Sequence, residues 1–228
     1  MAKTVRDYRE LLAAGRWFQC LSAPFADALV EAGRVREVSA GTRLFARGDA
    51  PDGVYAVLDG AIRAAGLGSD GKEAVLALVE PPQWFGEIAV FDGLPRTHDA
   101  TAVTDARLVH VPAAALSTML EANPAWWREL ALLVTAKLRL AFVMMEDTAL
   151  LPLAPRVAKR LAFMAEGYGE WADRSRRVVK VRQELLAAML SASRQSINQA
   201  LKDLEAKGLI RTSYGEIEIL DLDGLRSA

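Results

Sequence analysis

The chain has 228 residues, of which 52% are hydrophobic and 25% charged, as in an ordinary globular protein. This composition excludes an intrinsically disordered chain. It also excludes a membrane helix of roughly 20 apolar residues, because Lys137 and Arg139 interrupt the longest apolar run. No apolar segment follows the charged N-terminus, so we expect a cytoplasmic protein without a secretory signal. The single cysteine, Cys20, excludes a disulfide framework and four-cysteine metal sites.

The net charge of −1 is unevenly distributed along the chain. Residues 1–124 carry 12 Lys and Arg against 16 Asp and Glu, whereas residues 148–215 carry 12 against 6. A basic excess at one end favours a polyanionic partner such as nucleic acid.

Short β-rich runs separated by turn residues fill the segment from Gly41 to Pro112. Examples are VYAVLDG, AIRAAGL and AVLALVE, and Asp70-Gly71 is typical of a tight hairpin. Strands at this spacing predict a small antiparallel β-barrel or jelly roll. The first 30 residues have a helical pattern, which makes an α+β fold the expected class.

A long helix is expected from Ala125 to Asp147, because this stretch holds no Gly or Pro and follows the start signal Asn123-Pro124. One set of its residues has heptad spacing, namely Ala131, Val134, Leu138, Ala141, Met145 and Thr148. A second apolar set lies beside it, so one face can pack on the N-terminal domain while the heptad contacts a second copy of the chain. A single buried helix is the alternative.

Pro152 and Pro155 break the helical pattern and indicate a domain boundary. We therefore expect an effector-sensing β domain over 1–124, a dimerisation helix over 125–149 and a DNA-binding domain over 150–228.

The segment QELLAAMLSASRQSINQALKDLEAK, residues 183–207, has the pattern of a helix-turn-helix. We expect a first helix over 183–190, then a turn at Ser191-Ala192, where many such turns carry glycine. The Ser193 hydroxyl can cap a second helix, whose inward stripe is Ile197, Ala200, Leu201 and Leu204. A hairpin turning at Tyr214-Gly215 follows as a wing.

Polar residues at the start of the second helix are left facing outward. In a helix-turn-helix this end enters the major groove, where Arg, Gln and Asn make bidentate contacts to guanine or adenine. The candidate DNA-binding residues are Ser193, Arg194, Gln195, Ser196, Asn198, Gln199 and Lys202. A helix pair that merely has a polar surface is the alternative.

The segment WFGEIAVFDGLPRTHDATA, residues 84–102, predicts a phosphate cradle. Free N–H groups of Gly86, Glu87 and Ile88 would point at an anion. Arg96 would form a bidentate pair with a phosphate, and Thr97 would add a hydroxyl donor. Glu87 can accept from a ribose hydroxyl. The alternative is an ordinary turn in which Arg96 pairs with Glu87 or Asp92.

Three segments together resemble the Crp–Fnr family of transcription regulators. Residues 41–63 resemble the entry strands of its cyclic-nucleotide-binding barrel, 85–97 its phosphate-binding cassette, and 193–210 its recognition helix and wing. The resemblance implies an N-terminal cyclic-nucleotide-binding β domain, a long dimerisation helix and a C-terminal winged helix-turn-helix.

The resemblance also implies residue roles. Glu87 matches the glutamate that holds the ribose, Arg96 the arginine that holds the cyclic phosphate, and Thr97 its hydroxyl neighbour. Arg194 matches the guanine-reading arginine, whereas Gln195 and Gln199 replace a Glu and an Arg at other base-reading positions. The Thr-Ser pair that holds adenine falls, counted without gaps, at Ala141-Phe142, which lack the hydroxyls. Adenine recognition is therefore in doubt.

The implied function is that of a homodimeric regulator gated by a cyclic nucleotide or a related phosphate-bearing effector. The implied partners are an inverted-repeat operator in double-stranded DNA, a second copy, RNA polymerase and the small-molecule effector, with no membrane. One alternative is a family member with an empty or repurposed pocket that does not respond to cyclic AMP. Another is a cyclic-nucleotide-binding regulatory subunit that does not touch DNA, against which the helix-turn-helix argues.

Other chemistry is sparse. His98 and His110 have no neighbouring cysteine, so we expect no metal site. His98 lies beside the cradle, either as an extra phosphate donor or as a structural turn residue. No Ser-His-Asp grouping or Gly-rich nucleotide loop indicates an enzyme or a catalytic residue.

Overall fold

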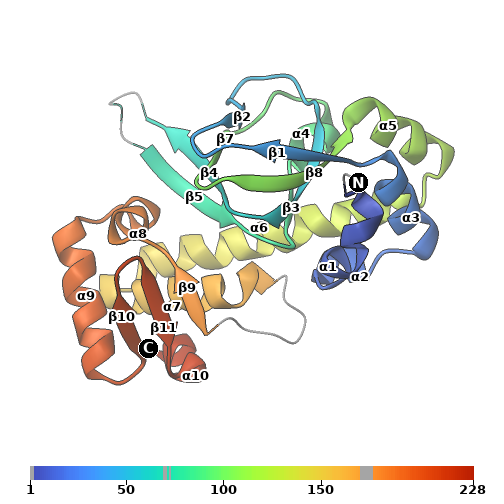
Figure 1. The fold of residues 1–228 in the computed structure, drawn as a ribbon. Coiled ribbons are helices and arrows are strands. Elements are labelled where there is room, and N and C mark those ends of the chain that lie inside the picture. The colour runs from blue at the N-terminus through green and yellow to red at the C-terminus, as the bar shows by residue number, and fades with distance from the viewer. Residues whose placement is uncertain (1–2, 69–70, 72, 170–176) are drawn as a thin grey trace. The chain divides into compact units, whose positions relative to one another are not determined.

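The strands between Arg34 and Pro112 form two antiparallel four-stranded sheets (Figure 1). The computed structural model describes residues 3–68, 71, 73–169 and 177–228. It divides into an N-terminal unit, residues 1–66 and 76–138, and a C-terminal unit, residues 67–75 and 139–228. Among the described helices, none is long and apolar enough to cross a membrane.

The first sheet has the order β1-β8-β3-β6 and the second the order β2-β7-β4-β5. The two sheets remain separate, so the jelly-roll form of the prediction is the one found and a closed barrel is not. The strands of the first sheet are β1 (Arg34–Val38), β8 (Ala106–Pro112), β3 (Gly53–Asp59) and β6 (Trp84–Phe85). Those of the second are β2 (Arg43–Phe45), β7 (Asp99–Ala102), β4 (Ile62–Leu67) and β5 (Glu73–Val79). The hairpin expected at Asp70-Gly71 lies partly outside the described residues.

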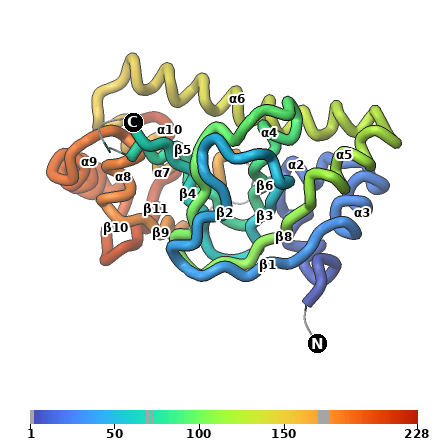
Figure 2. Tube along the Cα trace, turned by 90° about the horizontal axis from the view of Figure 1, so that it is seen from above, coloured from blue at the N-terminus to red at the C-terminus, as the bar shows by residue number. Residues whose placement is uncertain are grey.

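Helices of the N-terminal unit gather at one end of the sheets (Figures 1 and 2). They are η1 (Val5–Tyr8), α1 (Arg9–Ala13), α2 (Arg16–Gln19), α3 (Ala23–Ala32) and α5 (Ala113–Ala122), while α4 (Glu87–Asp92) belongs to the expected cradle. They share one hydrophobic core with β3, β8 and the start of the long helix α6 (Trp126–Leu150).

The start of α6 is fixed in the N-terminal unit by both apolar and polar contacts. Leu130 and Leu133 are fully buried in the core. The carboxylate of Glu129 accepts hydrogen bonds from the backbone N–H of Ser22 at 2.6 Å and from its hydroxyl at 2.8 Å. The indole N–H of Trp17 donates to the Glu129 carbonyl. Of the second apolar set, which comprises Leu130, Leu133, Leu140 and Met144, the first two therefore pack in the core of the N-terminal unit.

Helices and a small sheet follow one another in the C-terminal unit in the order of a winged helix-turn-helix (Figure 1). Its helices are α7 (Leu153–Ala165), η2 (Gly167–Gly169), α8 (Gln183–Leu190), α9 (Arg194–Ala206) and α10 (Leu222–Ser227). Its strands, in the order β10-β11-β9, are β10 (Ile210–Ser213), β11 (Glu216–Ile219) and β9 (Val178–Lys180). The β10-β11 hairpin turns at Tyr214-Gly215, as expected.

Candidate effector site and nucleic-acid interface

The cradle begins where β6 passes into α4 through Gly86. This glycine has φ +90°, and a Cβ there would lie 2.9 Å from an Arg96 guanidinium nitrogen and 3.1 Å from the Gly53 carbonyl. A side chain would therefore displace Arg96, so only glycine fits this approach. α4 starts at the next residue, Glu87, which confirms the expected short helix.

Arg96 lies beneath this turn and is almost fully buried, with 3% of its surface exposed. Its guanidinium donates to the carbonyls of Gly86 and Gly53, each at 2.7 Å, and forms an ion pair with Asp52. It also lies over the Phe45 ring, 4.1 Å from the centroid. The acidic partner of Arg96 is therefore Asp52, and not Glu87 or Asp92, the two partners named in the alternative of an ordinary turn.

The Asp52 carboxylate is shared between two donors. One oxygen accepts from Arg96 and the other from the Tyr55 hydroxyl. Burial alone would raise the pKa of Asp52, but the bonds from Tyr55 and Arg96 outweigh it, and the pKa lies below its usual value. Asp52 therefore stays ionised near neutral pH. Burial, and then the hydrogen bond to Asp52, raise the pKa of Tyr55, which stays protonated.

Glu87 is 1% exposed, and its partner comes from the long helix. The Lys137 ammonium donates to the Glu87 carboxylate at 2.8 Å and to the Trp84 carbonyl at 2.7 Å. A buried carboxylate is costly unless it is paired, and Lys137 provides the pairing. The two cradle residues expected to bind ligand, Glu87 and Arg96, are thus both engaged with groups of the same chain.

The remaining expected ligand contacts are more exposed. Thr97 is exposed, and its hydroxyl lies 2.8 Å from Nδ1 of His98. The pKa of His98 is lowered, mainly by burial and then by the nearby Lys137 charge. The Ile88 side chain is also exposed. Ala141 and Phe142 lie on the part of α6 described with the C-terminal unit, so their role in the site stays a prediction.

The helix-turn-helix has the expected cap and inward face. The Ser193 hydroxyl accepts from the backbone N–H of Ser196 at 3.0 Å, so the predicted N-cap is confirmed. All four residues of the inward stripe are buried: Ile197, Ala200, Leu201 and Leu204. Arg194, Gln195, Ser196, Gln199 and Lys202 are exposed and Asn198 is half-buried.

The turn contains a conformation that a non-glycine residue seldom adopts. Ser191 ends α8 with φ +51° and ψ +43°, the left-handed region. A residue with a Cβ therefore holds a backbone conformation that glycine adopts without strain, and this conformation is unfavourable for Ser191.

Residues of α8 hold two of the outward side chains on α9. The Arg194 guanidinium pairs with Glu184 at 3.1 Å, and the Asn198 amide donates to the Gln183 side chain at 3.3 Å. Gln199 donates to Asp203 on its own helix. The outward side chains are thus oriented before any DNA is bound.

Sequence reasoning missed three of these partners: Asp52, Lys137 and Glu184. Lys137 was visible only as a charge that interrupts an apolar run, and such a charge signals a buried partner. Asp52 and Glu184 had no comparable signal, because each acts through a residue distant in the sequence.

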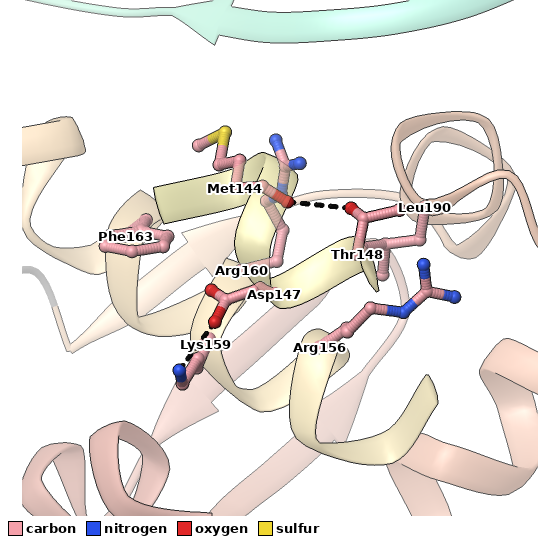
Figure 3. Close-up of a pocket in the computed structure, with 8 residues that line it drawn as sticks. All are labelled: Met144, Asp147, Thr148, Arg156, Lys159, Arg160, Phe163 and Leu190. Atoms are coloured by element: carbon pink, nitrogen blue, oxygen red, sulfur yellow. Dashed lines mark hydrogen bonds and ion pairs between the residues drawn. The ribbon is translucent and has the colours of Figure 1, made fainter. Parts of the chain in front are cut away.

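A further hollow lies where α6, α7 and the end of α8 meet in the C-terminal unit (Figure 3). Lys159 of α7 donates to Asp147 of α6 at 2.6 Å, and the Thr148 hydroxyl donates to the Met144 carbonyl. Arg156 and Arg160 of α7 line the same hollow. The ion pair joins the end of α6 to α7, the first helix that lies wholly within the C-terminal unit.

Comparisons with known proteins agree with both units. The cyclic nucleotide-binding domain model matches residues 35–123, and the Crp-like helix-turn-helix domain model matches residues 155–228. A CRP-like cAMP-activated global transcriptional regulator of Mycobacterium tuberculosis is 30% identical over 95% of this chain and 97% of its own. Transcriptional regulator SdrP of Thermus thermophilus is 31% identical over 77% of this chain and 83% of its own.

Solved structures give the same result. A CRP/FNR-family transcriptional regulator of Thermus thermophilus has a TM-score of 0.66 and 30% identity, covering 85% of this chain and 97% of that chain. FixK2 of Bradyrhizobium japonicum, at 20% identity, shares the fold with a TM-score of 0.75 over 86% of this chain and 96% of that chain.

A cyclic-nucleotide-binding domain followed by a winged helix-turn-helix defines a DNA-binding transcription regulator. The chain belongs to the CRP/FNR family of these regulators.

Proposed function

We propose that the protein binds inverted-repeat DNA as a homodimer and is gated by a phosphate-bearing effector, with a cyclic nucleotide as the first candidate. The proposal of a phosphate-bearing effector is supported by the buried guanidinium of Arg96. Its Nε–H has no hydrogen-bond partner. A buried donor without a partner costs about 1–3 kcal/mol, and an anion beside Arg96 would supply the missing acceptor.

The proposed effector contacts divide into two groups. Gly86, Glu87, Ile88, Arg96 and Thr97 supply phosphate and ribose contacts, which are common to all cyclic nucleotides. Ala141 and Phe142 supply no hydroxyl to the base, and Phe142 is 61% exposed. Aromatic stacking on Phe142 would not distinguish one base from another. We therefore propose weak binding with little selectivity between bases.

The weak, unselective binding proposed here differs from what the names of two relatives say about cyclic AMP. The M. tuberculosis relative is named cAMP-activated, and a Thermus thermophilus relative, 27% identical over 78% of this chain and 80% of its own, is named cyclic AMP receptor protein. Loss of hydrogen bonds to a buried base costs about 1–3 kcal/mol per group. The alternative within the family is a repurposed pocket that does not respond to cyclic AMP.

Calorimetry of the purified protein against cyclic AMP, cyclic GMP and cyclic di-GMP tests the effector proposal. We expect weak binding of the cyclic mononucleotides, which Arg96→Ala abolishes. Arg107→Ala is the matched control, because Arg107 pairs instead with Glu37 and Tyr8. Tight binding with a strong preference for cyclic AMP would contradict the base argument. If no nucleotide binds, the repurposed pocket is favoured.

The dimer is proposed from the exposed apolar side chains of α6. Leu138 is 50% exposed, and Met145 is 66% exposed. Both belong to the heptad, and a stripe of this kind packs well against a copy of itself. A dimer also places two recognition helices on one inverted repeat, and a gel shift on single and paired half-sites measures this directly.

Gating follows from differential affinity. An effector shifts the equilibrium between two conformations only as far as it binds one of them more tightly than the other. A shift in their ratio from 1:99 to 99:1 needs a difference in binding free energy of about 5.5 kcal/mol. In this proposal the effector acts on Glu87 and Arg96, α6 carries the change, and the Lys159–Asp147 pair passes it to α7. RNA polymerase is the expected downstream partner, and the protein catalyses no reaction.

A further inference from the structure

Asp52 and Arg96 belong to a longer chain of contacts inside the N-terminal unit. Arg96 donates to Oδ1 of Asp52, and the Tyr55 hydroxyl donates to Oδ2. The Asp52 side chain is 44% exposed, whereas that of Arg96 is 2% exposed. Asp52 therefore occupies, from the solvent side, a guanidinium edge that a phosphate would need.

His110 on β8 completes this chain of contacts. Its ring stacks on Tyr55, opposite it on β3, with centroids 4.5 Å apart. Its Nε2 lies 3.1 Å from the Asp52 carbonyl, which can only accept, so Nε2 carries a proton. The same Nε2 lies 3.9 Å from Oδ2 of Asp52, and the side chain is 15% exposed. A second proton on this ring would make it a cation facing the carboxylate that holds Arg96.

The charged groups around His110 come from every element packed against it. Asp52 precedes β3 and Arg96 follows α4, while β1 carries both Arg36 and Arg34, of which Arg34 is the residue paired with His110 in the sheet. Arg36 also donates to the Tyr55 hydroxyl at 3.3 Å. The pKa of His110 is lowered, and burial is the main cause. The positive charges of Arg36 and Arg96 lower this pKa further, whereas the contacts with Asp52 raise it. His110 is therefore neutral at neutral pH.

We propose that Tyr55 and His110 are positioning residues of the effector site, because they set how strongly Asp52 holds Arg96 and so how readily Arg96 binds a phosphate. The proposal rests on the proposed function, namely anion binding at Arg96. It adds that this binding responds to protonation of His110.

The sign follows from the contacts. Protonated His110 shares the charge of Asp52, which loosens the hold of Asp52 on Arg96 and leaves the guanidinium freer for the ligand. The added positive charge also favours an anion nearby. Both effects strengthen phosphate binding at acidic pH, and by linkage the ligand raises the pKa of His110.

Titration of cyclic AMP and cyclic GMP into the full chain at pH 7.5 and 5.5 tests this inference. The phosphodiester keeps one charge over this range, so a change in affinity reports on the protein. We expect binding about 3- to 10-fold tighter at pH 5.5, as one pKa unit of coupling gives a factor of ten. His110→Gln keeps a donor for the Asp52 carbonyl but cannot be protonated, so it abolishes the rise.

His98 is the other histidine of the chain and serves as the control, because histidine is the only side chain whose ordinary pKa lies between pH 5 and 8. His98→Gln retains the pH dependence, whatever it does to the affinity itself. Tyr55→Phe removes one donor from Asp52, tightens its pairing with Arg96 and weakens binding about 10-fold at pH 7.5, the loss expected for a hydrogen bond to a charged group.

Each outcome separates the two proposals. If wild-type protein binds neither nucleotide, the proposed function fails and this inference fails with it. If wild-type protein binds with the same affinity at both pH values, only the inference is overturned. A pH dependence that His98→Gln removes and His110→Gln retains overturns it equally, because the proton then belongs to the other ring.

Discussion

Lys137 Nζ lies 2.8 Å from the carboxylate of Glu87, although 50 residues separate them in the sequence. The pair joins the long helix to the first residue of the cradle helix. Any ligand whose hydroxyl approaches Glu87 therefore meets a carboxylate already held by α6. This contact is a direct physical link between the proposed effector site and the helix proposed to form the dimer.

Removal of Lys137 should destabilise the N-terminal unit. Lys137→Ala leaves a buried carboxylate and the Trp84 carbonyl without their donor, and Lys137 is itself 39% exposed, which screens part of the effect. We expect a loss of about 1–3 kcal/mol in the free energy of unfolding, measured by urea denaturation.

Arg139→Ala removes a positive charge at an exposed position of the same helix. It should change the free energy of unfolding by no more than about 0.5 kcal/mol. The double variant Lys137→Met with Glu87→Gln should cost less than the two single changes added together. Additive costs would show that the pair does not act as a unit.

Sequence reasoning succeeded where the signal was local. The bounds of the first helix of the helix-turn-helix, the Ser193 cap and the inward stripe all depend on residues within one or two turns of each other. Apolar periodicity and capping determine such features directly. The cradle turn at Gly86 was found for the same reason.

Sequence reasoning failed where partners come together only in the folded chain. Asp52 precedes Arg96 by 44 residues and reaches it because β3 and the loop after α4 meet in the jelly roll. Nothing near Arg96 in the sequence marks that contact. The apolar pattern of α6 allowed two faces, and only packing selects Leu130 and Leu133 for the core.

The dimer prediction concerns the heptad residues on α6. Leu138→Asp with Met145→Asp places charges on the proposed seam, and burial of an unpaired charge opposes association. We expect monomers in sedimentation experiments at micromolar concentration. Ala136→Asp, on an exposed position outside the heptad, should leave the dimer intact. A monomeric wild-type protein would contradict the proposal outright.

The DNA prediction uses the Arg194–Glu184 pair. Arg194→Ala should cost about 1–3 kcal/mol at one base pair of each half-site and flatten the selected motif there. An unchanged motif would argue against the assignment of Arg194 as a base-reading residue.

Glu184→Gln should have a different effect on DNA binding, because it keeps Arg194 but removes the carboxylate charge that orients it. We expect tighter binding to random DNA, since one repelling carboxylate is lost, and a lower ratio of specific to non-specific affinity. Glu121→Gln, an equal charge change in the N-terminal unit, should leave that ratio unchanged. Parallel gains on both kinds of DNA would show that Glu184 acts through charge alone.

The turn of the helix-turn-helix offers a stabilising substitution. Ser191 has a left-handed backbone that costs about 1–2 kcal/mol for a residue with a Cβ. Ser191→Gly should raise the free energy of unfolding of the C-terminal unit by about 0.5–1 kcal/mol, because the greater flexibility of unfolded glycine offsets part of the gain. Ser193→Gly, in an extended cap, should not stabilise it.

The stability of the N-terminal unit should depend on pH in a defined direction. His98 and His110 both have a pKa below the unfolded value of about 6.5, and burial is the main cause for each. Between the two values the unfolded chain binds more protons than the folded one, so protonation favours unfolding. The contribution of these two histidines to the free energy of unfolding is therefore fully present above about pH 6.5. It declines as the pH falls toward their pKa values in the folded protein. Urea midpoints at pH 7.5 and 5.5 should show this decline, and His110→Gln with His98→Gln should remove the histidine part of it. A midpoint that rises on acidification in wild-type protein would mean that the two rings gain protons on folding, which is the opposite of what their burial predicts.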